Sequence, residues 1–328
     1  MRCTTILCLC GLLLVSLTAQ AKSPKGSELP FHLYWNYLVV VEGSIGDWNK
    51  RNFLIDTGAN PSMLDQRIAD RLGLNGPAEK LPVLNGEVNI RRVSVPALRL
   101  GPLTRDTVEM GVQDLSFLER DLGVRIDALI GLDVLSERSF HIDYAAKRLR
   151  FDDQPAGAGA ASFASGPPFV TVEMQMENQP VRLLVDTGAS GLILFGGPVA
   201  SQLRELPPTA AANGASITGR IRMREVQITN ARLGNTDLGS RRAFVAEHRK
   251  TDDFDGLLGI SPLNVREISF DFEHRLLTWQ PRDSGFTATS NAGLVVCTSA
   301  GPGAMSSSPA KGLVEPSRCT EETEAHRK

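Results

Sequence analysis

Two aspartates in the same local sequence are the residues of this chain best suited to chemistry. Asp56-Thr57-Gly58-Ala59 recurs as Asp186-Thr187-Gly188-Ala189, each directly after an apolar pair, Leu54-Ile55 or Leu184-Val185. An aspartate between an apolar strand and a glycine can be held on a tight loop in a cleft, where the glycine allows close approach. Two such loops facing each other would bring two carboxyl groups together.

Two adjacent carboxyl groups cannot both ionise easily, so the pair holds one shared proton and titrates as a unit. One carboxylate can then take a proton from a water that attacks a peptide carbonyl, while its protonated partner donates to the carbonyl oxygen. The chemistry needs no cofactor and no metal. The hydroxyls of Thr57 and Thr187 could bond across to the opposite loop, although threonine is also an ordinary turn residue.

The chain is an internal duplication. The second aspartate follows the first by 130 positions (186 minus 56), and three later features repeat with a shift of 128. They are Asn85-Gly86 with Asn213-Gly214, Asp127 to Leu132 with Asp255 to Ile260, and Phe140 to Tyr144 with Ile268 to Phe272. This period is far longer than that of a solenoid repeat, so each copy should be a compact unit.

Short strands and frequent turns predict an all-β architecture. Residues 37–41 and 51–55 read as a hairpin that leads into the first aspartate loop, and residues 169–176 and 181–185 repeat it. One helix per copy is expected, over 63–72 after a Ser62 cap and over 199–206 after Pro198. Residues 34–153 and 168–282 are then the two lobes, residues 154–167 a flexible linker, and residues 283–328 a disordered tail.

The chain resembles an aspartic protease of the retropepsin-like type, with two lobes fused in one exported polypeptide as in many bacterial members. The similarity covers roughly residues 34–282 and depends on two signatures that each occur twice, the apolar-Asp-Thr-Gly-Ala loop and a later apolar-apolar-Gly segment. The second signature is Leu129-Ile130-Gly131 and Leu257-Leu258-Gly259. The resemblance implies two closed-barrel lobes that form a pseudo-dimer, with Asp56 and Asp186 as the catalytic pair.

The resemblance also implies a flap, a β-hairpin that closes over an extended polypeptide substrate. Asn-Gly favours a two-residue hairpin turn, so Asn85-Gly86 and Asn213-Gly214 are the expected flap tips, with an ordinary surface hairpin as the alternative for either one. Both aspartate loops carry alanine, Ala59 and Ala189, where pepsin-like enzymes usually carry serine or threonine. With fewer hydrogen bonds to the carboxylates, activity should extend toward mildly acidic or neutral pH.

Composition excludes several classes of partner and site. The formal net charge of -2 gives no bias toward nucleic acid or anionic membranes. The five histidines are scattered without metal-ligand spacing. Arg220, Arg222 and Arg224 alternate along one strand face, which is more typical of a solvated sheet edge than of a binding surface.

Residues 1–21 have the form of a signal peptide. Arg2 precedes an apolar stretch from Ile6 to Leu17, and Ala19-Gln20-Ala21 has the small-x-small pattern of a cleavage site. We expect export to a periplasmic or extracellular location, with no membrane segment in the mature chain; an uncleaved anchor is the alternative. Cys297 and Cys319 would remain after cleavage and could pair in an oxidising compartment.

Three functional hypotheses follow. The first is a monomeric endopeptidase in which the two copies form one intramolecular pair of carboxyl groups. The second keeps this chemistry but pairs each copy with another chain. The third is a catalytically silent peptide-binding protein of the same fold, against which the aspartate in both copies argues, because a pure binder has no use for two crowded carboxyl groups.

Overall fold

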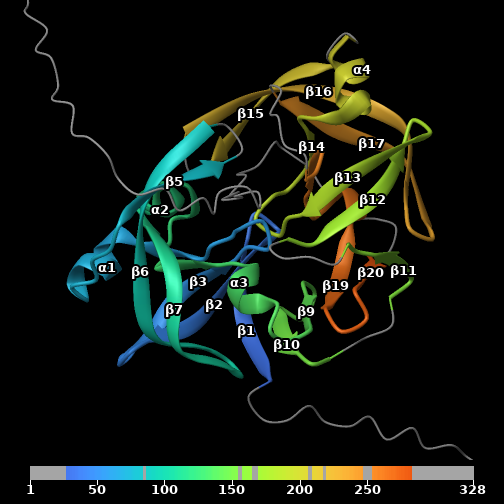
Figure 1. Cartoon of the computed structure of the whole chain (residues 1–328). Helices are drawn as coiled ribbons and strands as arrows, with labels where there is room; N and C mark the ends of the chain where they lie inside the picture. The colour runs from blue at the N-terminus through green and yellow to red at the C-terminus, as the bar shows by residue number, and fades with distance from the viewer. Residues whose placement is uncertain are drawn as a thin grey trace, which may run out of the picture.

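The fold is built almost entirely from strands, as the sequence predicts. The computed structural model describes residues 27–83, 86–153, 157–164, 169–205, 209–216, 219–246 and 253–282. Figure 1 shows the strands of the first half, in blue to green, beside those of the second half, in yellow to orange. The expected architecture of two homologous barrel-like lobes is confirmed, although the two barrels are not evenly closed.

The first lobe is a ring of six strands in the order β2-β3-β8-β4-β7-β6. The ring closes where β6 returns to β2 through two residue pairs, Ser44 with Arg99 and Ile45 with Leu98. The short strand β5 pairs with the outer part of β6. The bounds are β2 Leu38–Ile45, β3 Trp48–Ile55, β4 Met63–Asp65, β5 Ala78–Val83, β6 Gly86–Leu100, β7 Leu103–Gln113 and β8 Ala128–Ile130.

The second lobe repeats this ring in the order β12-β13-β18-β14-β17-β16. It closes through three residue pairs between β12 and β16, and β15 pairs with the outer part of β16. The bounds are β12 Thr171–Met176, β13 Gln179–Val185, β14 Leu192–Leu194, β15 Ala210–Ser216, β16 Gly219–Leu233, β17 Thr236–Ala246 and β18 Gly256–Leu258.

A third sheet joins the halves, with three strands from each. Its order is β11-β20-β19-β9-β10-β1, and these strands lie along the lower part of Figure 1. The central pair is β9 and β19, where Phe140 lies opposite Phe270 and His141 opposite Ser269. The bounds are β1 Glu28–Tyr34, β9 Phe140–Asp143, β10 Arg148–Phe151, β11 Gly159–Ser162, β19 Val265–Asp271 and β20 Leu276–Pro281.

Aromatic packing between the two halves stabilises this shared sheet. The rings of Phe140 and Phe270, one from each half, stack with centroids 4.7 Å apart and an interplanar angle of 23°. Both side chains are fully buried. Because these two phenylalanines come from different halves, the core of one lobe is continuous with the core of the other.

The expectation of a flexible linker over residues 154–167 was wrong for the part that the structure describes. Gly159–Ser162 form β11, which pairs with β20 as β1 pairs with β10 in the first half. The small side chains there have a packing role, since a Cβ added to Gly159 would lie 2.1 Å from the Trp279 ring. The first half likewise begins before Tyr34, because β1 starts at Glu28.

The first expected helix is shorter than its sequence pattern indicated, whereas the second is close to its predicted length. Residues 63–65 extend the sheet as β4, and α1 covers only Gln66–Arg71, with Asp65 rather than Ser62 as its cap. In the second half α4 spans Gly197–Glu205, close to the prediction. The remaining short helices are α2 Ser116–Leu122, α3 Leu132–Leu135 and the 3-10 turn η1 Ser261–Leu263.

Asn213-Gly214 does not form a hairpin turn, so that prediction was wrong. Both residues lie inside β15, and the hairpin turns four positions later, between the paired residues Ser216 and Gly219. The register is set by β16, whose buried Ile221 and Met223 alternate with exposed arginines, and this pattern overrides the local preference of Asn-Gly. Gly219 has φ 112° and takes the position that Gly86, with φ 139°, occupies in the first half.

The first predicted hairpin agrees better with the structure. Val83 pairs with Gly86, so the chain turns between these two residues. Asn85 itself lies outside the described residues.

The arginine strand is not a sheet edge, which corrects a further expectation. Arg220, Arg222 and Arg224 belong to β16, which has β17 on one side and β15 on the other. The first two are exposed and Arg224 is half-buried.

The shared sheet makes the two lobes one cooperative unit, which predicts the effect of Phe270→Ala. Truncating this buried ring should lower the free energy of unfolding by about 3–5 kcal/mol and leave a single transition. Chemical denaturation followed by fluorescence and circular dichroism measures both, with Phe117→Ala, at a partly buried position of the first lobe, as the control. Two separate transitions in the wild type would contradict this account.

Candidate active site

The two aspartate loops are held in the same way in both lobes. Each aspartate directly follows the last residue of a strand, β3 for Asp56 and β13 for Asp186. Its backbone N–H donates to a carbonyl of the neighbouring strand: Asp56 to Ile130 and Asp186 to Leu258, both at 3.0 Å. A tight turn follows, in which the alanine N–H returns to the aspartate carbonyl at 3.1 Å in the first loop and 3.2 Å in the second. Both side chains are fully buried.

The glycine of each loop lies against the carboxyl group of the other loop. A Cβ added to Gly58 would lie 2.5 Å from Cγ of Asp186, and one added to Gly188 would lie 2.8 Å from Cγ of Asp56. These distances are too short for any side chain, so glycine is required by the approach of the opposite carboxyl group. The sequence prediction that the two loops face each other therefore agrees with the geometry.

The two threonines bond across the same contact. The Thr57 hydroxyl donates to the Val185 carbonyl at 2.7 Å and accepts from the Thr187 N–H at 3.0 Å. The Thr187 hydroxyl mirrors this arrangement, with the Ile55 carbonyl at 3.1 Å and the Thr57 N–H at 3.0 Å. All four bonds are buried, where a lost partner costs about 1–3 kcal/mol. They fix the relative position of the two loops.

The electrostatics of the pair favour a shared proton. Burial, the negative charge of Asp186 and a hydrogen bond with the Asp186 carboxyl group raise the pKa of Asp56 well above its ordinary value. The N–H groups of Gly58 and Ala59 oppose this shift in part. In each loop the glycine N–H donates to Oδ1 of its own aspartate, at 2.9 Å for Asp56 and 2.7 Å for Asp186.

A second repeated aspartate supports each loop from behind. Oδ2 of Asp127 accepts from the Asn52 N–H at 2.9 Å, and Oδ2 of Asp255 accepts from the Arg182 N–H at the same distance. Each bond ties the segment before β8 or β18 to the strand that carries the active-site candidate. The Asp-x-Leu-x-Gly repeat is therefore a structural support and not a second pair of chemical groups.

The two lobes differ in a pair of polar residues whose contact was not predicted from the sequence. Ser62 donates to Oδ1 of Asp133 at 2.6 Å and accepts from the Gly131 N–H at 2.9 Å. Burial raises the pKa of Asp133, although Ser62 and nearby N–H groups oppose the shift. In the second lobe the corresponding N–H, that of Gly259, donates to the Gly191 carbonyl instead. The only indication of this contact in the sequence was the hydroxyl of Ser62, six positions after Asp56.

Tyr37 is a further residue that was missed. It is buried, it forms a side-chain hydrogen bond with Ser190 of the second aspartate loop, and the charge of Asp186 acts on it. Nothing in its local sequence indicates contact with the opposite lobe.

The two hairpins that were expected to act as flaps have buried inner faces. In the second lobe Ile221 and Met223 of β16 pack with Ala189 and Phe244 in a separate apolar cluster around the aspartate loop. In the first lobe Val88 and Ile90 occupy the matching positions of β6 and are also buried. The second hairpin thus packs toward its aspartate loop, the first has a matching buried face, and a flap function remains a prediction.

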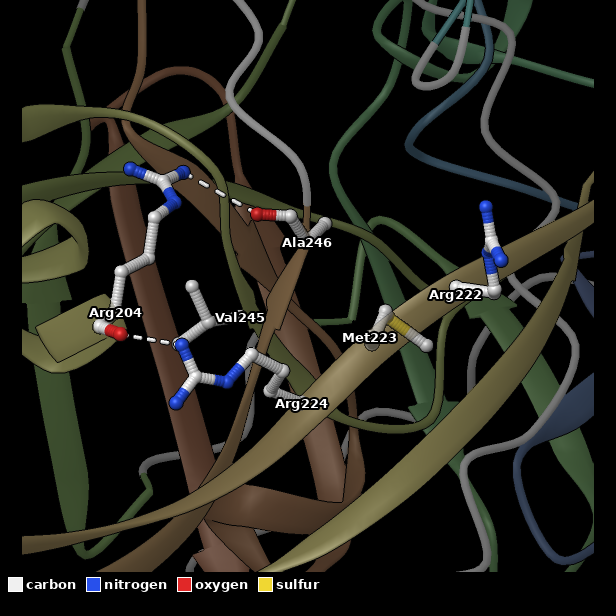
Figure 2. Close-up of a pocket in the computed structure, with 6 residues that line it drawn as sticks. All are labelled: Arg204, Arg222, Met223, Arg224, Val245 and Ala246. Carbon is white, nitrogen blue, oxygen red and sulfur yellow. Dashed lines mark hydrogen bonds between the residues drawn. The ribbon is translucent and has the colours of Figure 1, made fainter. Parts of the chain in front are cut away.

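A hollow of about 250 Å³ lies beside β16. Figure 2 draws the six residues that line it, Arg204, Arg222, Met223, Arg224, Val245 and Ala246. The Arg204 guanidinium donates to the carbonyls of Phe195 and Ala246, and Arg224 donates to the carbonyl of Arg204. The three guanidinium groups point in different directions and do not converge on one position. Their geometry indicates a structural role between α4 and the strands.

Among the described residues, no group of three or more histidine, cysteine, aspartate or glutamate side chains is arranged to hold a metal ion. Within the same ranges no helix has the length and apolar content needed to cross a membrane. The predicted signal peptide, Cys297, Cys319 and the predicted tail lie outside the described residues.

Comparison with known families agrees with this geometry. A family model described as aspartyl protease matches residues 41–134 and 170–261, once in each half. The chain belongs to the aspartyl protease family. Each matched range contains one aspartate loop and the strand that runs behind it, so the resemblance to a retropepsin-like protease with two fused lobes is confirmed. A search of curated proteins gave no match to the chain.

The raised pKa of Asp56 predicts how the stability of this aspartyl protease family member depends on pH. Above about pH 4 the unfolded chain releases the Asp56 proton while the folded chain retains it, so stability falls as pH rises toward the folded pKa. Asp56→Asn removes this penalty. Relative to wild type, it should gain stability between pH 4 and pH 7, by about 1.4 kcal/mol for each unit by which the folded pKa is raised.

Thermal unfolding across this pH range measures the effect, with the exposed Asp121→Asn on α2 as the control. If Asp56→Asn instead became less stable than wild type as pH rises, the carboxyl pair would not be strained at neutral pH.

Proposed function

We propose that the chain is an aspartic endopeptidase that hydrolyses peptide bonds with a water molecule activated between Asp56 and Asp186. The observation that carries this proposal is the close approach of two fully buried carboxyl groups from different lobes, each of which lies against the glycine of the opposite loop. A buried like-charged pair destabilises the fold, and a stable structure retains one where it performs chemistry. Membership of the aspartyl protease family supports the same reaction.

In the proposed reaction the pair acts as acid and base at once. The ionised carboxylate takes a proton from the water as its oxygen attacks the peptide carbonyl carbon, and the protonated carboxyl donates to the carbonyl oxygen. A tetrahedral gem-diol results. The newly protonated carboxyl group then donates its proton to the leaving nitrogen while the other carboxylate takes a proton from a gem-diol hydroxyl. The C–N bond breaks, a carboxylic acid and an amine are released, and the pair again holds a single proton.

The threonine bonds across the loops serve this chemistry by fixing the two carboxyl groups relative to each other. A catalytic group must stay within hydrogen-bond reach of the atoms whose protons it moves, and small displacements cost large factors in rate. The hydroxyl bonds of Thr57 and Thr187 restrain the loops from both sides. Since one pair forms from one chain, we propose that the monomer is the active species.

We propose an extended polypeptide as the substrate. We assign the hairpins β5–β6 and β15–β16 as flaps; in support, the apolar face of β16 packs in one cluster with Ala189 of the second aspartate loop. An extended segment between them could pair with strand backbone while its side chains meet the apolar cluster of the second lobe.

The test is cleavage of a mixed peptide library by the exported form of the chain. Asp56→Asn and Asp186→Asn should each lower kcat by at least about 10³-fold, because each removes one of the two groups that move protons. Asp121→Asn should cleave like wild type. Because the pair is buried and coupled, the activity should extend to mildly acidic or neutral pH.

Several outcomes would refute the proposal. Full activity in both asparagine variants would exclude the assignment of the pair. Peptide binding without turnover by the wild type would favour the silent binding protein, and a pH optimum well below 4 would contradict the expected effect of Ala59 and Ala189.

We also propose export, which rests on the sequence pattern of residues 1–21 alone. N-terminal sequencing of the protein recovered from the periplasm or medium should begin at Lys22. A chain that retains Met1 in the membrane fraction would favour the uncleaved anchor.

A further inference from the structure

Tyr37 directly precedes β2, which pairs with β3, the strand that leads to the first aspartate loop. It is the last residue of the three-residue turn between β1 and β2, in which Trp35 and Asn36 have φ 50° and 65°. Its N–H donates to the Tyr34 carbonyl at 3.1 Å and closes that turn. Trp35 is 45% exposed, whereas Tyr37 is only 4% exposed. The hairpin therefore directs one of its aromatic side chains into the protein.

The register of the sheet places Tyr37 at the contact between the two loops. Val39 pairs with Ile55, so Tyr37, two residues earlier, lies at the level of Thr57, two residues later. Thr57 is the residue that bonds across to the second lobe. From this position the Tyr37 side chain forms a hydrogen bond with Ser190, four residues after Asp186 in the opposite loop.

The Tyr37 hydroxyl stays neutral and lies within range of the charge of Asp186. Burial and the charge of Asp186 raise the pKa of Tyr37 far above its ordinary value, while the hydrogen bond with Ser190 lowers it in part. A phenol that stays protonated can donate to a carboxylate, and such a bond favours the ionised form of the acceptor. Asp56 and Tyr37 are ionisable groups that face Asp186 in the described structure.

The duplication does not repeat this hydroxyl. The Val185 N–H donates to the Val170 carbonyl, so Val170 corresponds to Val39. Counting back two residues along the sequence, the counterpart of Tyr37 is Pro168, which lies outside the described residues. Proline has no side-chain hydroxyl. At this position, therefore, the first lobe has a side-chain hydroxyl near the aspartate of the opposite loop, and the sequence of the second lobe has none.

We propose that Tyr37 is a positioning residue that makes the two aspartates inequivalent. Its hydroxyl, held by Ser190, stabilises the ionised form of Asp186, so the proton of the pair resides on Asp56. Asp186 is then the base that takes the proton from water, and Asp56 is the acid that protonates the carbonyl oxygen. This assignment rests on the proposed function, but the proton location is a property of the pair whether or not it turns over substrate.

The experiment is a ¹³C NMR titration of the full mature chain labelled at the aspartate carboxyl carbons. Asp56→Asn and Asp186→Asn assign the two signals. In wild type Asp186 should ionise at the lower pH, and Tyr37→Phe should raise its titration midpoint by about one pH unit. The acidic limb of kcat/KM should move upward by the same amount, because Asp186 must be ionised to act as the base.

Tyr144→Phe is the matched control. Tyr144 is also buried, but Arg282 and not the aspartate pair acts on it, so its titration curve and activity should match those of wild type. Ser190→Ala keeps the phenol and removes its partner, and it should give a smaller shift in the same direction. This variant also tests the proposal if Tyr37→Phe does not fold.

The inference would be overturned if Asp186 had the same titration midpoint in wild type, Tyr37→Phe and Ser190→Ala. It would also be overturned if Asp56 ionised at a lower pH than Asp186 in wild type. The titration requires no substrate. If the chain cleaved no peptide, the proposed function would be refuted, but the titration would still show which aspartate carries the proton.

Discussion

The close approach of two buried carboxyl groups is the constraint on which the rest of the structure depends. Desolvation and mutual repulsion both act against it, so the surrounding fold must hold the pair together at a cost in stability. Much of the architecture serves that purpose. The glycines at 58 and 188 leave no side chain between the loops, and the two threonines connect each loop to the strand that precedes the other.

The duplicated fold explains how one chain can meet this constraint. Two six-stranded rings each deliver one aspartate, and a third sheet with three strands from each half sets the distance between the rings. The stack of Phe140 on Phe270 lies in the middle of that sheet. Neither half could form the site alone, because each threonine and each glycine has its partner in the other half.

The symmetry is incomplete where chemistry benefits from a difference. A symmetric pair would hold its proton on either carboxyl group with equal probability, whereas an acid and a base must be distinct in the reaction. Ser62 with Asp133 in the first lobe, and Tyr37 with Ser190 between the lobes, have no repeated counterparts at matching positions. These departures mark where the two copies have separate roles.

Much of this arrangement could be predicted from the sequence, because the repeated loop motif and its apolar flanks depend on local composition. The hairpins that lead into Asp56 and Asp186, the strands behind them and the all-β class all follow from such patterns. Three features could not be predicted. The linker strand β11 has only small residues, because the Trp279 ring occupies the space beside Gly159.

The second hairpin turn was misplaced because buried alternation along β16 outweighs an Asn-Gly preference. Tyr37 was missed because its partners are about 150 residues away, and contact across lobes leaves no trace in local sequence.

The most direct test of the intramolecular pair is complementation between the two asparagine variants. Wild type, Asp56→Asn, Asp186→Asn and an equimolar mixture of the two variants, refolded together, would be compared for peptide cleavage over a range of dilution. The account predicts that wild type cleaves at a rate per chain that does not change on dilution, and that the mixture remains inactive. Cleavage by the mixture, lost on dilution, would show that the carboxyl pair forms between chains and would contradict the account.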